Sequence, residues 1–193
     1  MKFVACKAKV SNRGVPPDSV LTEFIEWGAI AADEIFAPSP NPVDIYADIE
    51  PILGPWVNLL HRRAALIETM RVTAGFESSW KWRQGVDVTN RTSMKHAAGQ
   101  ETGIFQVSFD STRINNGAMM PFAVAHGVGT VGSFIAYMKT DHKLAMEYFA
   151  RLSRINIRWD GPLIRHEIDP WLSRAAVAEI ITLLINQGAL DKK

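Results

Sequence analysis

The residues best suited to chemistry lie in two segments, 76–87 and 100–111. Glu77 continues an apolar stripe at helical spacing, so the period assigns a carboxyl group to the side of a helix that should face the core. Burial raises the pKa of a glutamate, and an acid that stays protonated near neutral pH can protonate a leaving group. We therefore predict that Glu77 is a general acid. The aromatic residues expected to enclose it are Phe76, Trp80 and Trp82.

A second carboxylate is expected beside Glu77, because two carboxyl groups in different environments can divide acid and base roles between them. The candidates are Glu101 and Asp87, either of which could position a water or offset positive charge that develops in the reaction. Glu101 is the first choice, since it lies two residues before Gly103. Asp87 is followed by polar residues typical of a turn, so its role could be local.

The order of these residues resembles a known superfamily. A Glu77-Ser78 pair closes an apolar helix, and a Gly-Ile-Phe-Gln string follows at residues 103–106. This combination resembles the lysozyme-like superfamily, which includes goose-type lysozymes and bacterial lytic transglycosylases. The longer pattern of Glu-Ser-Ser, Gly-x-Asp and Glu-x-Gly-x-Phe-Gln-x-Ser, followed by Asp-Ser, looks more like the bacterial branch.

The resemblance implies cleavage of peptidoglycan glycan strands at the MurNAc-GlcNAc β-1,4 bond, with Glu77 as the acid and no cofactor. Gln106 is expected to bind an N-acetyl group or to be a buried structural glutamine, and Tyr137 to lie near the acid or in the core. Ser108 stands where goose-type lysozymes carry an aspartate, so hydrolysis and transglycosylation both stay open. The positions predicted to bind substrate are Ser78, Trp82, Gln106, Ser108 and Tyr137.

The elements that must position these residues are predicted to be mainly helical. Apolar spacing and capping residues predict helices over 18–35, 55–77, 132–152 and 169–185, with Pro55 in a first turn and Asp169 as a cap. Periodicity is lost over residues 81–107, which predicts turns and short strands. We expect an α+β fold of the lysozyme-like kind, with a small irregular β region beside the catalytic helix.

Composition limits the other possibilities. The 193 residues, 47% of them hydrophobic, can bury one sizeable core, and we expect one domain over 1–193 with a helical extension at 1–50 and a catalytic core at 51–190. Lys and Arg number 21 against 20 Asp and Glu, which gives no broad field for nucleic acid or an anionic membrane. No stretch approaches the roughly 20 apolar residues of a membrane span. We therefore expect neither a nucleic-acid partner nor membrane insertion.

Four other interpretations compete with catalysis by Glu77. Residues 127–132 match Gly-x-Gly-x-x-Gly, but no strand follows their helix, so a turn explains the glycines better than a dinucleotide site. The five histidines lack the i, i+4 pairing of a zinc helix, and no metal is expected. A glycan-binding module without activity remains open, as does an ordinary ion pair of Glu77 with Arg71 or Lys81.

The N-terminal sequence bears on location. Lys7 and Lys9 interrupt its apolar run before a signal-peptide core can form. We expect synthesis in the cytoplasm and action in the periplasm of a target cell, as an antibacterial effector delivered by a contractile secretion machine. A cognate immunity protein would then occlude the cleft near Glu77. Release as a phage endolysin is the alternative route.

Overall fold

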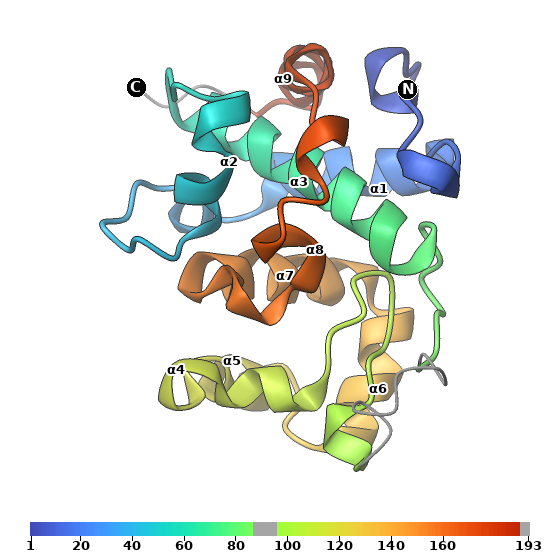
Figure 1. The fold of residues 1–193 in the computed structure, drawn as a ribbon, viewed down its shortest axis with the longest axis vertical. Coiled ribbons are helices and arrows are strands. Elements are labelled where there is room, and N and C mark those ends of the chain that lie inside the picture. Colours follow the sequence, from blue (N-terminus) through green and yellow to red (C-terminus); the bar gives the residue numbers. More distant parts are fainter. Residues whose placement is uncertain (87–95, 190–193) are drawn as a thin grey trace.

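A computed structural model describes residues 1–86 and 96–189, and helices make up most of this part of the chain (Figure 1). Short 3-10 helices connect the α-helices. In chain order the α-helices are α1 (Asp18–Ile30), α2 (Ile45–Leu53), α3 (Leu59–Ser78), α4 (Ile114–Gly117), α5 (Met120–Ala125), α6 (Val131–Thr140), α7 (His142–Ile155), α8 (Gly161–Ile164) and α9 (Arg174–Asn186).

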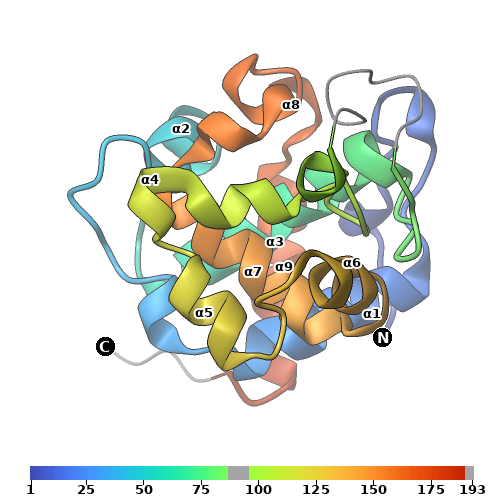
Figure 2. The ribbon, with the colours of Figure 1, turned by 90° about the horizontal axis from the view of Figure 1, so that it is seen from below.

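Helix α3 forms the centre of the fold. It begins where the Asn58 side chain accepts a hydrogen bond from the His61 N–H at 2.8 Å, so the predicted start at Pro55 is wrong. It packs mainly against α9 and α1, and Figure 1 shows it crossing the middle of the molecule. Figures 1 and 2 place α4, α5 and α6 on the far side of α7 from α3. Because α3 is covered on most sides, its polar residues are buried as well as its apolar ones.

The N-terminal segment folds back onto α9. The Glu179 carboxylate accepts hydrogen bonds from the Val4 and Cys6 N–H groups at 2.6 and 2.7 Å. After this contact the chain forms the 3-10 helix η2 (Ser11–Arg13), which packs against the C-terminal part of α3. One hydrophobic core extends from Phe3 to Ala189, and the boundary expected at residue 50 falls inside α2.

The predicted α+β fold with a small β region is wrong for the described residues, which contain no strand. Their only β pairing is two isolated bridges, Val10 with Gly14 and Thr102 with Val107. The second bridge consists of reciprocal N–H to carbonyl bonds of 2.9 and 3.2 Å around the turn at residues 103–106. The chain then enters the 3-10 helix η5 (Phe109–Arg113), so the pairing does not extend into a ladder. The mainly helical character agrees with the prediction.

The other three predicted helices also differ in their bounds. The helix expected over 18–35 ends at Ile30, as α1, and a separate 3-10 helix covers Asp33–Ile35. The helix expected over 132–152 is divided at Asp141, whose non-helical backbone and side-chain bond to the Leu144 N–H start α7 separately. Helix α9 is capped by Ser173 instead of Asp169, which belongs to the 3-10 helix η7 (Asp169–Trp171). None of the helices in the described part of the chain is long and apolar enough to span a membrane.

Candidate active site

A cavity of about 410 Å³ lies at the C-terminal end of α3. Segments far apart in the sequence form its walls: η2, the last turn of α3, the turn at residues 101–106, and the stretch around α8. The side chains that line it are largely charged or aromatic. They are Arg13, Phe76, Glu77, Glu101, Gln106, Trp159, Asp160, Pro162, Arg165 and Glu167, with Gly161 beside them.

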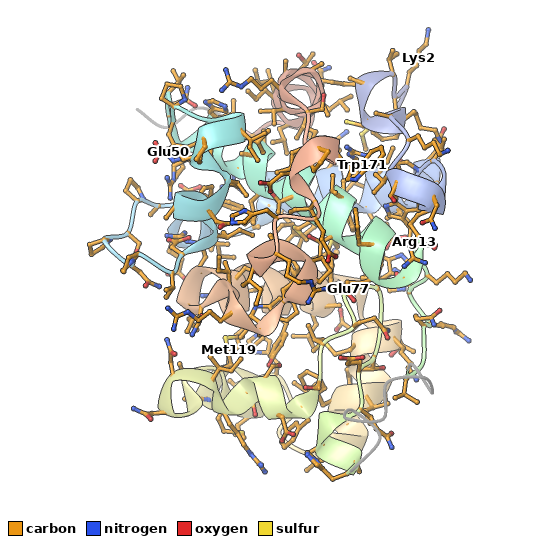
Figure 3. The ribbon with its side chains drawn as sticks, viewed as in Figure 1. Lys2, Arg13, Glu50, Glu77, Met119 and Trp171 are labelled. Carbon is orange, nitrogen blue, oxygen red and sulfur yellow. The ribbon has the colours of Figure 1, made fainter. Side chains whose placement is uncertain are left out.

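Glu77 is held by a tightly closed helix end. Ser79 and Trp80 both adopt left-handed backbone conformations, and the Trp80 N–H donates to the Ala74 carbonyl at 3.1 Å. The Trp80 ring folds back over Gly75, where a Cβ atom would lie only 2.7 Å from Cζ2. Its Nε1–H donates to the Arg71 carbonyl at 2.8 Å. The half-buried Glu77 is thereby fixed at the end of α3, near Arg13 (Figure 3).

Ser78 joins this helix end to the Gly-Ile-Phe-Gln turn. The Ser78 hydroxyl lies 2.8 Å from the Ile104 carbonyl and 3.1 Å from the Ala74 carbonyl, and it accepts the Lys81 N–H. The turn requires glycine, because Gly103 has a φ of +74° and a Cβ there would lie 2.4 Å from the Met138 carbonyl oxygen. Ser78 is therefore a buried structural link in this protein.

The same turn brings two predicted residues to the cavity. Gln106 is buried, and its Nε2 donates to the Gly103 carbonyl at 2.8 Å, which closes the turn through the side chain. Glu101 lies just before the Thr102 to Val107 bridge and lines the same cavity as Glu77. The structure thus gathers Glu77, Glu101 and Gln106 at one place.

The electrostatic setting of Glu77 favours its protonated form. Burial is the largest cause that raises its pKa, and the nearby carboxylates of Asp160 and Glu101 raise it further. Arg13 and Arg165 act in the opposite direction but do not outweigh these effects. Glu77 therefore keeps its proton at pH values well above the ordinary pKa of a glutamate.

Asp160 is the carboxylate that the sequence did not indicate. It is buried, it caps α8 by accepting the Leu163 N–H at 3.1 Å, and burial raises its pKa. Before a Gly-Pro pair it carries only the ordinary signal of a helix start. Trp159, which supplies an aromatic wall together with Phe76, was also missed, because its place beside Glu77 is a contact between segments distant in sequence.

The other predicted residues lie elsewhere. Trp82 stacks on His142 with ring centroids 3.9 Å apart, and the Ser108 carbonyl accepts the Ser111 hydroxyl at 2.6 Å. Tyr137 is 45% exposed on α6. None of these three lines the cavity, and neither does Ser78. Asp87 falls outside the described residues.

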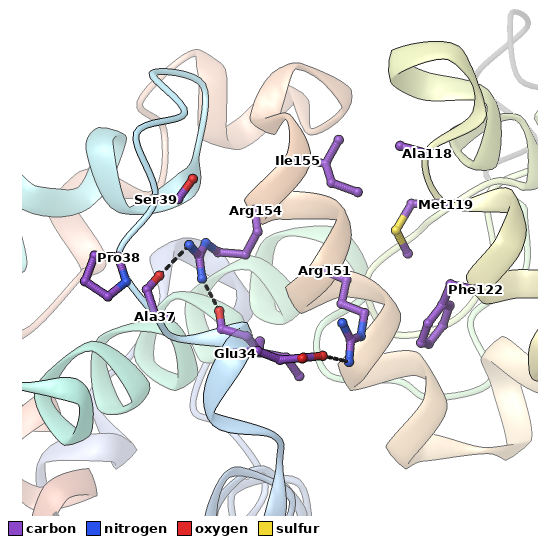
Figure 4. Close-up of a pocket in the computed structure, with 11 residues that line it drawn as sticks. Glu34, Ala37, Pro38, Ser39, Ala118, Met119, Phe122, Arg151, Arg154 and Ile155 are labelled. Atoms are coloured by element: carbon purple, nitrogen blue, oxygen red, sulfur yellow. Dashed lines mark hydrogen bonds and ion pairs between the residues drawn. The ribbon is translucent and has the colours of Figure 1, made fainter. Parts of the chain in front are cut away.

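A second cavity, of about 420 Å³, lies between the 3-10 helix η3 (Asp33–Ile35), α5 and α7 (Figure 4). Its two arginines are already paired: Arg151 with Glu34 and Glu147, and Arg154 with Asp44. Such neutralised cations supply no free charge for an anionic ligand. Within the described residues, no three His, Cys, Asp or Glu side chains are grouped to hold a metal ion.

No known protein family, characterised protein or solved structure matches this chain. Function is therefore inferred from the side chains of the first cavity.

Proposed function

We propose that this chain cleaves the glycan strands of peptidoglycan, with Glu77 as the acid catalyst. One observation carries the proposal: Glu77 faces a cavity, is fixed at a helix end, and lies beside two further carboxylates that favour its protonated form. A glutamate kept protonated near neutral pH is the group that acid cleavage of a glycosidic bond needs. The resemblance of residues 77–106 to lysozyme-like enzymes supports the choice of peptidoglycan as substrate.

The reaction begins with proton transfer from Glu77. Its O–H bond breaks as the proton moves to the glycosidic oxygen, and the C–O bond to the anomeric carbon breaks with its electron pair passing to that oxygen. Positive charge then develops on the sugar ring. Glu101, on the neighbouring turn, is suited to stabilise this charge or to orient a water.

Two second steps complete the reaction, and they give different products. In hydrolysis, water adds to the anomeric carbon and gives one proton to a carboxylate. In transglycosylation, a hydroxyl of the same sugar adds instead and returns its proton to Glu77, which leaves a terminal anhydro sugar. We favour hydrolysis, because a second carboxylate lines the cavity and could receive the proton of the water.

The walls of the cavity suit an amphipathic, acidic sugar chain. Phe76 and Trp159 offer apolar surfaces, while Gln106 offers an amide. Arg13 and Arg165 are exposed at the cavity, where they can face the carboxylates that peptidoglycan carries on its lactyl groups and peptide stems.

The test is the Glu77→Gln variant on purified sacculi. The amide keeps the shape of the side chain and loses the transferable proton, so solubilisation of sacculi should fall by about 10²–10⁴-fold. Glu26→Gln is the matched control, because Glu26 is exposed on α1 away from the cavity. Mass spectrometry of the released muropeptides then separates reducing ends from anhydro ends. Near-normal solubilisation by Glu77→Gln would refute the proposal, and wild-type protein that binds sacculi without releasing fragments would indicate a glycan-binding module.

A further inference from the structure

Asp160 lines the same cavity as Glu77, yet it approaches from a distant part of the chain. Asp160 is 2% exposed. One oxygen, Oδ1, accepts the Leu163 N–H at 3.1 Å, which fixes the orientation of the group at the start of α8. The other oxygen, Oδ2, is also buried and has no hydrogen-bond partner among the described residues.

An unpartnered carboxylate oxygen in a buried position is costly unless the group holds a proton or shares one. The cap supplies only one donor, so Oδ2 is left to the groups of the cavity. Glu77 also lines this cavity, and burial disfavours its ionised form as well. Two carboxyl groups in such a setting do not both ionise, and they hold one proton between them over a range of pH.

We propose that Asp160 is a positioning residue that shares one proton with Glu77, so that the two carboxyl groups form a proton-holding pair. The negative charge on Asp160 keeps the proton on Glu77 until the substrate takes it. This inference rests on the proposed function only in naming the substrate as the acceptor of that proton. The pairing itself is a property of the cavity and can be measured without substrate.

Other charged groups also act on the two members of the pair. Arg13 of η2 and Glu101 of the adjacent turn act on Glu77, while Asp48 of α2 and Glu167 act on Asp160. Arg165 acts on both, but it is exposed and its Nε donates to Glu167 at 2.7 Å, so part of its charge is already offset. Asp160 is the largest charged influence on the Glu77 proton after burial.

The test is the Asp160→Asn variant, which removes the charge and keeps an oxygen that can cap α8. The pKa of Glu77 should then fall, by on the order of one unit. It is measured by ¹³C NMR as the titration of the Glu77 Cδ signal, assigned by its loss in Glu77→Gln. Asp141→Asn is the matched control, because Asp141 caps α7 in the same way, by accepting the Leu144 N–H at 3.0 Å.

The expected result is a high titration point for Glu77 in the wild type and in Asp141→Asn, and a lower one in Asp160→Asn with an unchanged circular dichroism spectrum. The alkaline limb of sacculus solubilisation should move to lower pH by the same amount. Asp160→Glu, which restores the charge, should restore the titration point at least in part. An unchanged Glu77 titration in Asp160→Asn would overturn the pairing.

The NMR titration also separates the two proposals. A shifted Glu77 signal in a protein that cleaves no glycan at any pH would leave the pairing standing and reject the proposed function. If cleavage depends on Glu77 but the Glu77 titration point does not shift in Asp160→Asn, the proposed function stands and the pairing is rejected.

Discussion

Two glutamates on α3 differ in what surrounds them. Glu68, in the middle of the helix, is fully buried, and Arg71 donates to it twice, from Nε at 2.6 Å and from Nη2 at 2.7 Å. The Ser173 N–H adds a third bond at 2.9 Å. Glu77, at the end of the same helix, is half-buried, and the charges that act on it most strongly after burial are those of Asp160 and Glu101.

The difference shows that burial alone does not mark a functional acid. Burial raises the pKa of both glutamates, but at Glu68 the bonds from Arg71 and Ser173 oppose it. Glu68 together with Arg71 forms a neutral unit that ties α3 to the N-terminal segment and to η7, since Arg71 also donates to the Ala8 and Trp171 carbonyls at 3.1 Å. At Glu77 like charges gather, which is unfavourable for the fold and useful for holding a proton.

The largest effect on stability is expected from Glu68→Gln. It leaves the Arg71 guanidinium buried without its carboxylate, and breaking a buried pair in this way costs about 3–5 kcal/mol. Urea denaturation followed by circular dichroism measures the loss. The activity of the remaining folded protein should stay close to that of the wild type, because Glu68 lies outside the cavity.

The double variant Glu68→Leu/Arg71→Met provides the control for that loss. It removes both charges, so it should recover part of the stability that Glu68→Gln loses. If Glu68→Gln unfolds at the same urea concentration as the wild type, the ion pair with Arg71 does not stabilise the fold, and pairing does not distinguish Glu68 from Glu77.

A smaller effect is expected from Glu101→Gln. If Glu101 orients water or offsets charge on the sugar, the rate of sacculus solubilisation should fall on the order of 10²-fold, with little change in the urea midpoint. Glu26→Gln again serves as the control. A negligible change, together with anhydro ends among the products, would assign the second step to the sugar's own hydroxyl and make the protein a transglycosylase.

The place of Glu77 in the last turn of α3 could be predicted because an apolar stripe at helical spacing is a local signal. The turn at Gly103 could be predicted in the same way, because glycines and polar residues over 81–107 are local signals of turns. The predicted β region was wrong, because glycines and polar residues indicate turns but do not show whether the flanking segments form paired β-strands. Here the chain enters η5 directly after one bridge.

Asp160 and Trp159 could not have been predicted as parts of the cavity. Their place beside Glu77 depends on how α8 packs near the end of α3, which is a contact between segments distant in sequence. Local sequence at Asp160 specifies only a cap. Trp82 was misassigned for the converse reason: a tryptophan close to Glu77 in sequence turns away and stacks on His142.

The smallest effect is expected on the melting temperature of Glu77→Gln. This substitution should stabilise the fold at pH 7, whereas Glu68→Gln should destabilise it. Because the pKa of Glu77 is raised in the folded protein, the unfolded chain releases this proton first as pH rises above about 4.3. The stability that protonated Glu77 contributes is therefore complete below that pH and is lost as pH rises through the pKa of Glu77 in the folded protein.

Glutamine does not ionise, so Glu77→Gln should melt a few degrees higher than the wild type at pH 7, at about 2–4 °C per kcal/mol for a chain of this size. The gain should shrink towards zero near pH 4, and Glu26→Gln, at an exposed position on α1, is the control for the substitution itself. Calorimetric melting temperatures between pH 4 and 8 measure it, and a Glu77→Gln variant that melts below the wild type at pH 7 would show that Glu77 stabilises the fold as Glu68 does.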